Sequence, residues 1–240
     1  MSIKAVLFDL DGTLLKMDQE IFVKTYFKYL AKHLAPRGYE PEKLLKVFWE
    51  GVTAMINNDG SKTNEEAFWK VFTSAYGENS IEDKSHIDDF YQNDFNRVEQ
   101  VCGFYKEANE IIQLVKEKGK IAVLATNPLF PHTATENRMR WAGLNQEDFA
   151  DYTTYENCHF CKPNPKYYEE LLQKLNLKPE ECLMVGNDVN EDMVPTEKLG
   201  LQGFLLTNCL INKTEEDISR FPRGDFEALK AFLEEILWEK

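Results

Sequence analysis

The sequence lacks an excess of basic residues, a long apolar run and an even number of cysteines, and each absence excludes a class of protein. Its 240 residues include 28 Lys and Arg against 41 Asp and Glu, which gives a formal charge of −13. A nucleic-acid-binding protein needs a basic face to neutralise phosphates, so we expect no nucleic-acid partner. No uninterrupted apolar stretch approaches the roughly 18 residues of a membrane span, so we expect no membrane insertion.

The cysteines and the first residues favour a cytoplasmic protein. Five cysteines cannot all be paired, which excludes a complete disulfide framework. The chain enters a strand-like segment directly, without the basic and apolar regions of a secretory signal. Cys158 and Cys161 form a CxxC pair, but a four-ligand zinc site would need a second such pair, and the sequence has none. We therefore expect the reducing cytoplasm and no metal at this pair.

Short, nearly continuous apolar runs recur along the chain and predict buried strands. They lie at residues 3–8 (IKAVLF), 121–125 (IAVLA) and 182–185 (CLMV), with a weaker candidate at 203–206 (GFLL). Such runs suit strands that are buried on both faces of a parallel sheet. Helical patterns lie between and after them, at residues 106–118, 165–175, 191–199 and 225–238. This alternation predicts a doubly wound, Rossmann-like α/β core.

Residues 16–100 separate the first two predicted strands and are far too long for a simple connection, which needs only about a dozen residues. The segment contains fourteen aromatic residues, and its apolar positions recur at helical spacing. We therefore predict a core made of residues 1–15 and 101–240, with an inserted all-helical domain between them. Trp49 and Trp69 are expected in the core of that insertion.

Polar residues follow the predicted strands at the points where the strands end. Residues 9–13 (DLDGT) follow the first strand, residues 126–127 (TN) the second, and residues 186–192 (GNDVNED) the third. In an open parallel sheet, ligands bind outside the carboxyl ends of the strands, so we expect these residues to share one crevice. A loop at residues 161–165 (CKPNP), stiffened by two prolines, can bring Lys162 into it.

Together these four segments resemble the motifs of the haloacid dehalogenase-like superfamily of phosphohydrolases. The order is DxDGT, then Thr-Asn after a strand, then Lys-Pro-Asn-Pro, then an acidic GNDxxxD. The likeness covers the core from end to end, and the helical insertion is similar to the helical C1-type cap of that family. The matching residues are Asp9, Asp11, Thr126, Asn127, Lys162, Asn187, Asp188 and Asp192.

The resemblance implies a role for each of the first three motifs. Asp9 would be the nucleophile that attacks phosphorus, and Asp11 would protonate the leaving oxygen and later deprotonate a water molecule. Lys162 would be a third catalytic residue. Thr126, Asn127 and Lys162 would bind the phosphate of the substrate.

Magnesium is the implied cofactor, because the acids of the site would otherwise repel a phosphate. Mg²⁺ bound by Asp9, Asp188 and the backbone carbonyl of Asp11 would cancel much of that charge. The fourth motif of the family commonly carries aspartate where this chain has Asn187, so Asp188 is the predicted ligand. Asn187 and Asp192 are predicted either to support the ligands or to replace one of them. Asp188 can also serve simply as the cap of the helix that follows.

The predicted activity is that of a Mg²⁺-dependent phosphatase that hydrolyses a small phosphorylated metabolite through an aspartyl-phosphate. A phosphomutase of the beta-phosphoglucomutase kind would keep every motif, so this alternative stays open. A non-enzymatic phospho-acceptor or binding module is a further alternative, whereas a dehalogenase would have no need of Asp11. The sequence carries no signal for the oligomeric state.

Two groups of basic residues outside the motifs also carry predictions. A phosphonatase-like enzyme would need a lysine in the insertion, for which Lys24, Lys28 and Lys32 are the candidates. Arg138 and Arg140 are expected to lie on the surface of a helix.

Overall fold

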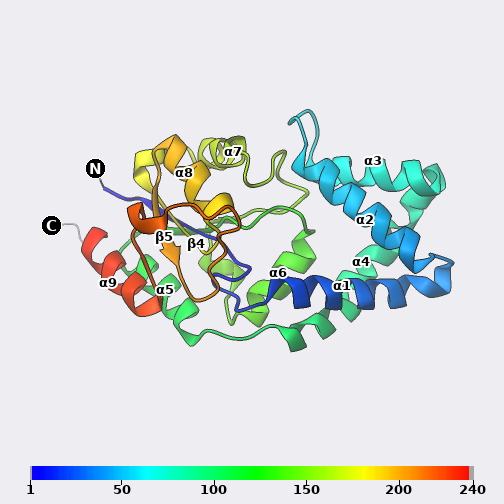
Figure 1. Cartoon of the computed structure of the whole chain (residues 1–240), viewed down its shortest axis with the longest axis horizontal. Helices are drawn as coiled ribbons and strands as arrows, with labels where there is room; N and C mark the ends of the chain where they lie inside the picture. Colours follow the sequence, from blue (N-terminus) through cyan, green and yellow to red (C-terminus); the bar gives the residue numbers. More distant parts are fainter. Residues whose placement is uncertain (1, 238–240) are drawn as a thin grey trace.

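The computed structural model describes residues 2–237, which form an elongated molecule with a sheet at one end and a group of helices at the other (Figure 1). Six parallel strands build the sheet: β1 (Ala5–Phe8), β2 (Ile121–Leu124), β3 (Asp151–Tyr152), β4 (Cys182–Gly186), β5 (Gln202–Leu206) and β6 (Arg223–Gly224). Their order is β3-β2-β1-β4-β5-β6. Within the described range no helix has the length and apolar character needed to cross a membrane.

Helices cover both faces of the sheet because alternate strand residues point to opposite sides. Val6 and Phe8 belong to one apolar cluster, whereas Ala5 and Leu7 belong to the other. In Figure 1, α7 and α8 lie above the strands and α5 and α9 below them. These helices are α5 (Lys106–Glu117), α7 (Pro165–Leu175), α8 (Val194–Leu199) and α9 (Phe226–Ile236). The predicted doubly wound α/β class is confirmed.

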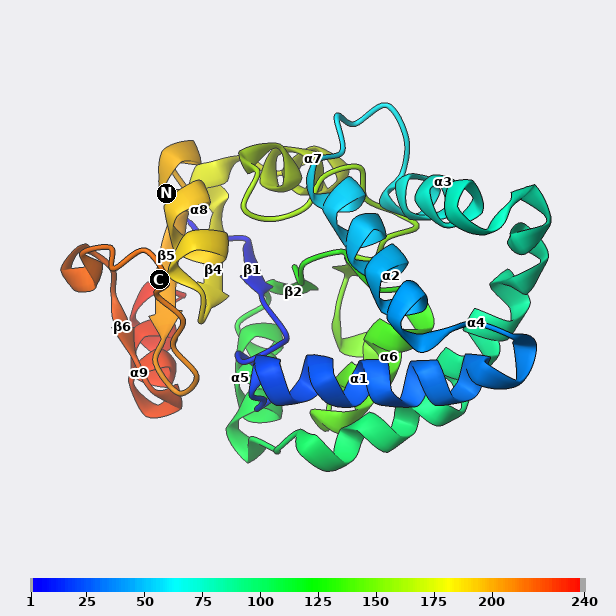
Figure 2. The same cartoon turned by 45° about the vertical axis from the view of Figure 1, so that its right-hand side comes forward.

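The segment between β1 and α5 is helical, as its periodicity predicts. In Figure 2 its four α-helices occupy the right-hand side of the view, and α1 begins beside β1. They are α1 (Gln19–Leu34), α2 (Pro41–Ile56), α3 (Asn64–Tyr76) and α4 (Lys84–Gln92), followed by a 3₁₀ helix at Asp94–Val101. Aspartate and threonine cap two of them: Asp18 accepts from two backbone N–H groups of α1, and Thr63 forms a reciprocal capping box with Glu66 at α3. We call this segment the helical part.

The helical part contacts the sheet part at its two connections, at the start of α3, and where α4 packs against α6 (His132–Trp141). Its two connections run beside each other, where the Gly103 N–H donates to the Lys16 carbonyl at 2.6 Å and Met17 bridges Cys102. The buried Asn64, at the start of α3, donates from its amide to the carbonyl of Phe160 at 3.3 Å. A boundary near residues 15 and 101 remains a prediction, although these contacts are where a hinge between two domains would lie.

Several elements differ from the sequence-based expectation. β3 and β6 were not predicted, because two residues are too few to show a pattern. The helix expected at residues 191–199 begins earlier, as one π-helical turn at Val189–Met193 that continues into α8. The expectation that Trp49 is buried was wrong, since it is 46% exposed, whereas Trp69 is buried. Trp238, at the end of the last predicted helix, lies outside the described residues.

Candidate functional site

A charged cavity lies at the carboxyl ends of β1, β2 and β4. The chain moves outward from β1 through β2 to β3 and then returns to β4 on the other side, so the strand order reverses beside β1. Such a reversal opens a crevice outside the strand ends. The cavity has a volume of about 180 Å³, and seven of the eight motif residues line it: Asp9, Asp11, Thr126, Asn127, Asn187, Asp188 and Asp192.

Asp9 stands at the end of β1 with both carboxylate oxygens engaged. Its Oδ1 accepts from Lys162 Nζ at 3.0 Å, and its Oδ2 accepts from the Thr13 hydroxyl at 3.2 Å. The carboxylate is nearly buried. It is therefore held in one orientation at the cavity wall, which is what a nucleophile needs.

Lys162 reaches Asp9 from the loop that precedes α7. Asn164 caps that helix by accepting from the Lys166 N–H, and Pro165 occupies its first position, so the KPNP segment fixes where the loop ends. Lys162 is fully buried and also donates to Asp192 Oδ1 at 2.6 Å. Burial alone would lower the pKa of Lys162, but Asp192 and Asp9 outweigh it and raise this pKa well above its usual value. Lys162 is thus a fixed positive charge beside the nucleophile.

The fourth motif follows β4 and supplies both a helix cap and a support for Lys162. Asp188 Oδ1 accepts from the backbone N–H groups of Asn190 and Glu191, so the capping interpretation is confirmed. The reciprocal partner is Asp192, whose Oδ2 accepts from the Asp188 N–H at 3.0 Å. Asp192 therefore links the start of this helix to Lys162, while the other oxygen of Asp188 is left for the cavity.

Two glycines leave room for close contacts, one between the first and fourth motifs and one within the fourth motif. A Cβ on Gly12, whose φ is +90°, would lie 2.4 Å from Nδ2 of Asn187. A Cβ on Gly186 would lie 2.2 Å from Oδ2 of Asp192. The approach lets Asn187 accept from the Thr13 hydroxyl at 2.9 Å, which ties the two motifs together.

Thr126 and Asn127 follow β2 and face the same cavity. The Thr126 carbonyl accepts from the hydroxyls of Thr153 at 2.6 Å and Tyr167 at 2.9 Å, which fixes the backbone at the strand end. Asn127 Nδ2 donates to Glu191 Oε2 at 3.0 Å, whereas its buried Oδ1 has no partner among the described residues. These contacts fix the backbone of Thr126 and the side-chain amide of Asn127 at the cavity that Asp9 also lines.

Asp11 has a partner that the sequence did not indicate. Its Oδ2 accepts from Nη1 of Arg138, which is fully buried in α6 (His132–Trp141). The prediction that Arg138 lies on a helix surface was therefore wrong, although Arg140 is exposed. Arg138 also donates to the Ala134 carbonyl and stacks 4.4 Å over the ring of Phe130. The apolar residues of α6 do not form a stripe at helical spacing, so the burial of Arg138 could not be predicted from them.

The pKa of Asp11 reflects this environment. Burial raises it to about 6, while the Arg138 guanidinium opposes the rise. A carboxyl with such a pKa exchanges its proton near neutrality, as an acid–base group must. Its Oδ1 is buried without a hydrogen-bond partner within residues 2–237 and lines the cavity, which leaves an acceptor for a bound ligand.

Glu191 is an acidic residue of the cavity that the motifs did not single out. Burial raises its pKa to about 7, and the negative charges of Asp188 and Asp9 add to the rise. Only its place between Asp188 and Asp192 could have pointed to it. It adds a further acid whose proton is lost near neutral pH.

The donor set suits magnesium better than a metal held entirely by side chains. Among the described residues, no three His, Cys, Asp or Glu side chains are grouped as a metal site. Mg²⁺ commonly uses one or two carboxylates and keeps several waters. Asp9 and Asp188 line the cavity and offer such a pair, and Asp11, whose backbone carbonyl is the third predicted ligand, lines the same cavity. The residues present therefore fit a magnesium ion.

Other candidate residues lie outside the cavity. The three lysines proposed for a phosphonatase-like reaction are exposed, and none lines the charged cavity: Lys24, Lys28 and Lys32. Cys158 and Cys161 are buried free thiols. Asn64 donates to the Cys161 Sγ at 3.3 Å, so this cysteine belongs to the contact with the helical part.

Comparison with known proteins places this site in a family. The model for haloacid dehalogenase-like hydrolases matches residues 3–198. The pyrophosphatase PpaX of Bacillus cereus is 26% identical over 201 residues, which cover 83% of this chain and 81% of the relative.

Two solved structures share the fold. The 2-haloacid dehalogenase of Pseudomonas syringae pv. Tomato superposes with a TM-score of 0.62 at 19% identity, covering 97% of this chain and 99% of the other. The hydrolase YfnB of Bacillus subtilis, described as bound to magnesium, gives a TM-score of 0.56 at 17% identity and covers 97% and 99% of the two chains. The family model spans most of the sequence and includes all four motifs, so this chain belongs to the haloacid dehalogenase-like hydrolases.

Proposed function

We propose that this hydrolase is a Mg²⁺-dependent phosphatase that cleaves the phosphate ester of a small metabolite through an aspartyl-phosphate. The observation that carries the proposal is the grouping of Asp9, Asp11 and Asp188 around one cavity, with Lys162 bonded to Asp9. A nucleophile, an acid and compensating positive charge are thus available within one small space.

In the first half of the reaction, a carboxylate oxygen of Asp9 forms a bond to phosphorus and the ester P–O bond breaks. The departing alkoxide takes the proton of Asp11 and leaves as the alcohol. Lys162 and Thr13 hold Asp9 in place, and Thr126 presents its hydroxyl to a phosphoryl oxygen. Each donor aimed at charge that develops in the transition state contributes about 3 kcal/mol.

In the second half, water attacks the phosphorus of the aspartyl-phosphate and the bond to Asp9 breaks. Asp11, now ionised, accepts the proton of the water, so the enzyme returns to its starting state and inorganic phosphate is released. A pKa near 6 lets the same carboxyl act first as an acid and then as a base.

Asp9, Asp188 and the backbone carbonyl of Asp11 would hold the magnesium ion. When bound, it would supply positive charge that offsets the repulsion between these acids and the phosphate. Asp192 would not bind the magnesium ion directly, because its two oxygens accept hydrogen bonds from Lys162 and from the Asp188 N–H.

The presence of Asp11 favours a phosphatase over a dehalogenase, because a halide leaving group needs no proton. A phosphomutase would use the same residues but transfer the phosphoryl group to another position of the sugar. Release of inorganic phosphate separates the two, since a mutase releases little.

The test is phosphate release from a panel of phosphorylated metabolites, with Mg²⁺ and after chelation. Asp9→Asn should abolish release because an amide is not a nucleophile, while the melting temperature stays close to wild type. Asp59→Asn, an exposed position in the connection between α2 and α3, is the matched control and should keep full activity. Substantial hydrolysis by Asp9→Asn, or by the chelated enzyme, would refute the proposal.

A further inference from the structure

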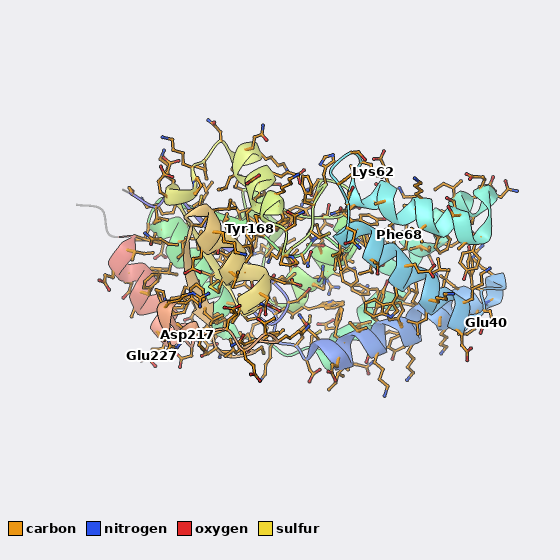
Figure 3. The ribbon with its side chains drawn as sticks, turned by 45° about the horizontal axis from the view of Figure 1, so that its top comes forward. Glu40, Lys62, Phe68, Tyr168, Asp217 and Glu227 are labelled. Atoms are coloured by element: carbon orange, nitrogen blue, oxygen red, sulfur yellow. The ribbon has the colours of Figure 1, made fainter. Side chains whose placement is uncertain are left out.

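A second cavity, of about 110 Å³, lies between the helical part and the loops that follow β2 and β3. Helices α1, α2, α3 and α4 supply most of its wall, and Leu129, Phe130 and Tyr155 supply the rest. Figure 3 labels Phe68 of α3, one of its lining residues, within the helical part. None of the side chains that line it is charged. We call it the apolar cavity.

The apolar cavity adjoins the charged cavity. Val23, Leu129 and Phe130 line both of them. Leu129 follows the phosphate-binding candidate Asn127 by two residues. Along α1, the residues that face the charged cavity are succeeded after one turn by Tyr26 and Phe27, which face the apolar one. One helical turn is about 5 Å, so a molecule of a few bonds can reach from one cavity to the other.

The hydroxyls nearest the apolar cavity offer little to a polar ligand. The hydroxyl of Tyr26 is hydrogen-bonded to that of Tyr91 at 2.7 Å, and both side chains are buried. Other lining residues are aliphatic or aromatic, including Phe48, Val52 and Met55. The indole N–H of Trp69, which lines the cavity, is buried without a hydrogen-bond partner among residues 2–237 and offers one donor. A sugar, a carboxylate or a second phosphate placed here would therefore lose most of its hydrogen bonds to water without replacement.

We infer that the apolar cavity binds the organic part of the substrate, and that the substrate is the phosphate ester of a small aromatic or branched aliphatic alcohol. The inference rests on the proposed phosphatase function and assigns its substrate class. Apolar cavities of roughly 150 Å³ in other proteins stay dry and bind benzene, so this slightly smaller space suits one ring or a short branched chain.

This substrate class differs from that named for the relative in Bacillus cereus, which is a pyrophosphatase. Pyrophosphate has no apolar group to fill the cavity. Adding or removing one methylene of a substrate in a hydrophobic pocket changes kcat/KM by about 10- to 200-fold. The expected preference for an apolar ester is therefore at least about tenfold in kcat/KM.

Benzyl phosphate and glycerol 1-phosphate provide the test, since both are primary alkyl esters and differ chiefly in the group that would enter the apolar cavity. Wild type should favour benzyl phosphate at least about tenfold in kcat/KM. Val52→Trp places a large ring into the cavity from α2 and should remove this preference. Lys46→Trp adds the same ring to the exposed face of α2 and should retain it. Melting curves of both variants check that each is folded.

A binding measurement gives a readout that does not depend on turnover. Calorimetry should detect benzyl alcohol binding to wild type and to Lys46→Trp, and lose it in Val52→Trp. Hydrolysis of glycerol 1-phosphate at a rate equal to that of benzyl phosphate would overturn this inference and leave the phosphatase function standing. Failure of wild type to hydrolyse either ester, or any other in the panel, would overturn both.

Discussion

Replacing Arg138 by methionine tests how much the buried ion pair with Asp11 contributes to the free energy of unfolding. Methionine keeps most of the length of the side chain but removes the charge and its hydrogen bonds. Arg138 is fully buried, and the Asp11 side chain is 21% exposed. The substitution thus leaves a carboxylate with little water and without its cation.

The size of the effect depends on pH through Asp11. In wild type its pKa is raised from 3.8 to about 6, so the unfolded chain loses this proton first and stability falls as pH rises between these values. Loss of an opposite charge in contact shifts a carboxyl pKa by roughly one to three units. At about 1.4 kcal/mol for each unit, and with pH 8 only about two units above the wild-type pKa, Arg138→Met should cost about 1–2.5 kcal/mol more near pH 8 than near pH 5.5, where folded Asp11 is mostly protonated in both proteins.

Urea unfolding of wild type and variant at these two pH values measures the difference. Arg140→Met is the matched control, because this exposed arginine of the same helix donates to the neutral side chains of Asn96 and Asn137, so the cost of its replacement should be the same at both pH values. Combining Arg138→Met with Asp11→Asn should remove most of the pH dependence, since no carboxylate is then left unpaired. A loss of stability that is equal at both pH values would refute the reasoning.

Two further substitutions test Asp11 as the acid of the reaction and Lys162 as the buried cation between Asp9 and Asp192. Asp11→Asn should lower kcat/KM for glycerol 1-phosphate by about 10²–10⁴-fold but affect kcat/KM for 4-nitrophenyl phosphate much less, because kcat/KM reports formation of the aspartyl-phosphate and the 4-nitrophenolate leaving group needs little protonation; equal losses in kcat/KM would contradict the role of Asp11 as the acid. Lys162→Met should destabilise the fold by about 3–5 kcal/mol, because it leaves Asp9 and Asp192 buried without their cation. Lys166→Met, at an exposed position of α7, is its control, and similar urea midpoints for the two variants would count against a buried ion pair.

Much of the fold could be predicted from local patterns. Runs such as residues 3–8 are apolar on both sides because β1 and β4 are covered on both faces, and the sheet has the predicted class. The bounds of α7 are the predicted ones, since Pro165 and Asn164 mark its start. The two-residue strands β3 and β6 could not be predicted, because the sheet edge and not their own sequence determines them.

Most motif residues could also be predicted from the sequence, because they follow strands whose positions were predictable. The structure brings Asp9, Thr126 and Asp188 to one cavity, as the topology requires. Their catalytic and metal-binding roles remain predictions. The motifs did not indicate that Asp192 bonds both Lys162 and the N–H of Asp188, since such a contact depends on how the π-helical turn is placed.

The burial of the strands and the polar residues at their ends can be read from the amino-acid sequence, because they depend on neighbours in the chain and on the period of the strand. The burial of Arg138 against Asp11, in contrast, results from the packing of α6 against the first motif. Packing of distant elements also makes Val23 and Phe130, more than a hundred residues apart, line one apolar wall beside the charged cavity. Such pairings depend on how separate elements pack, and no local period of hydrophobicity records them.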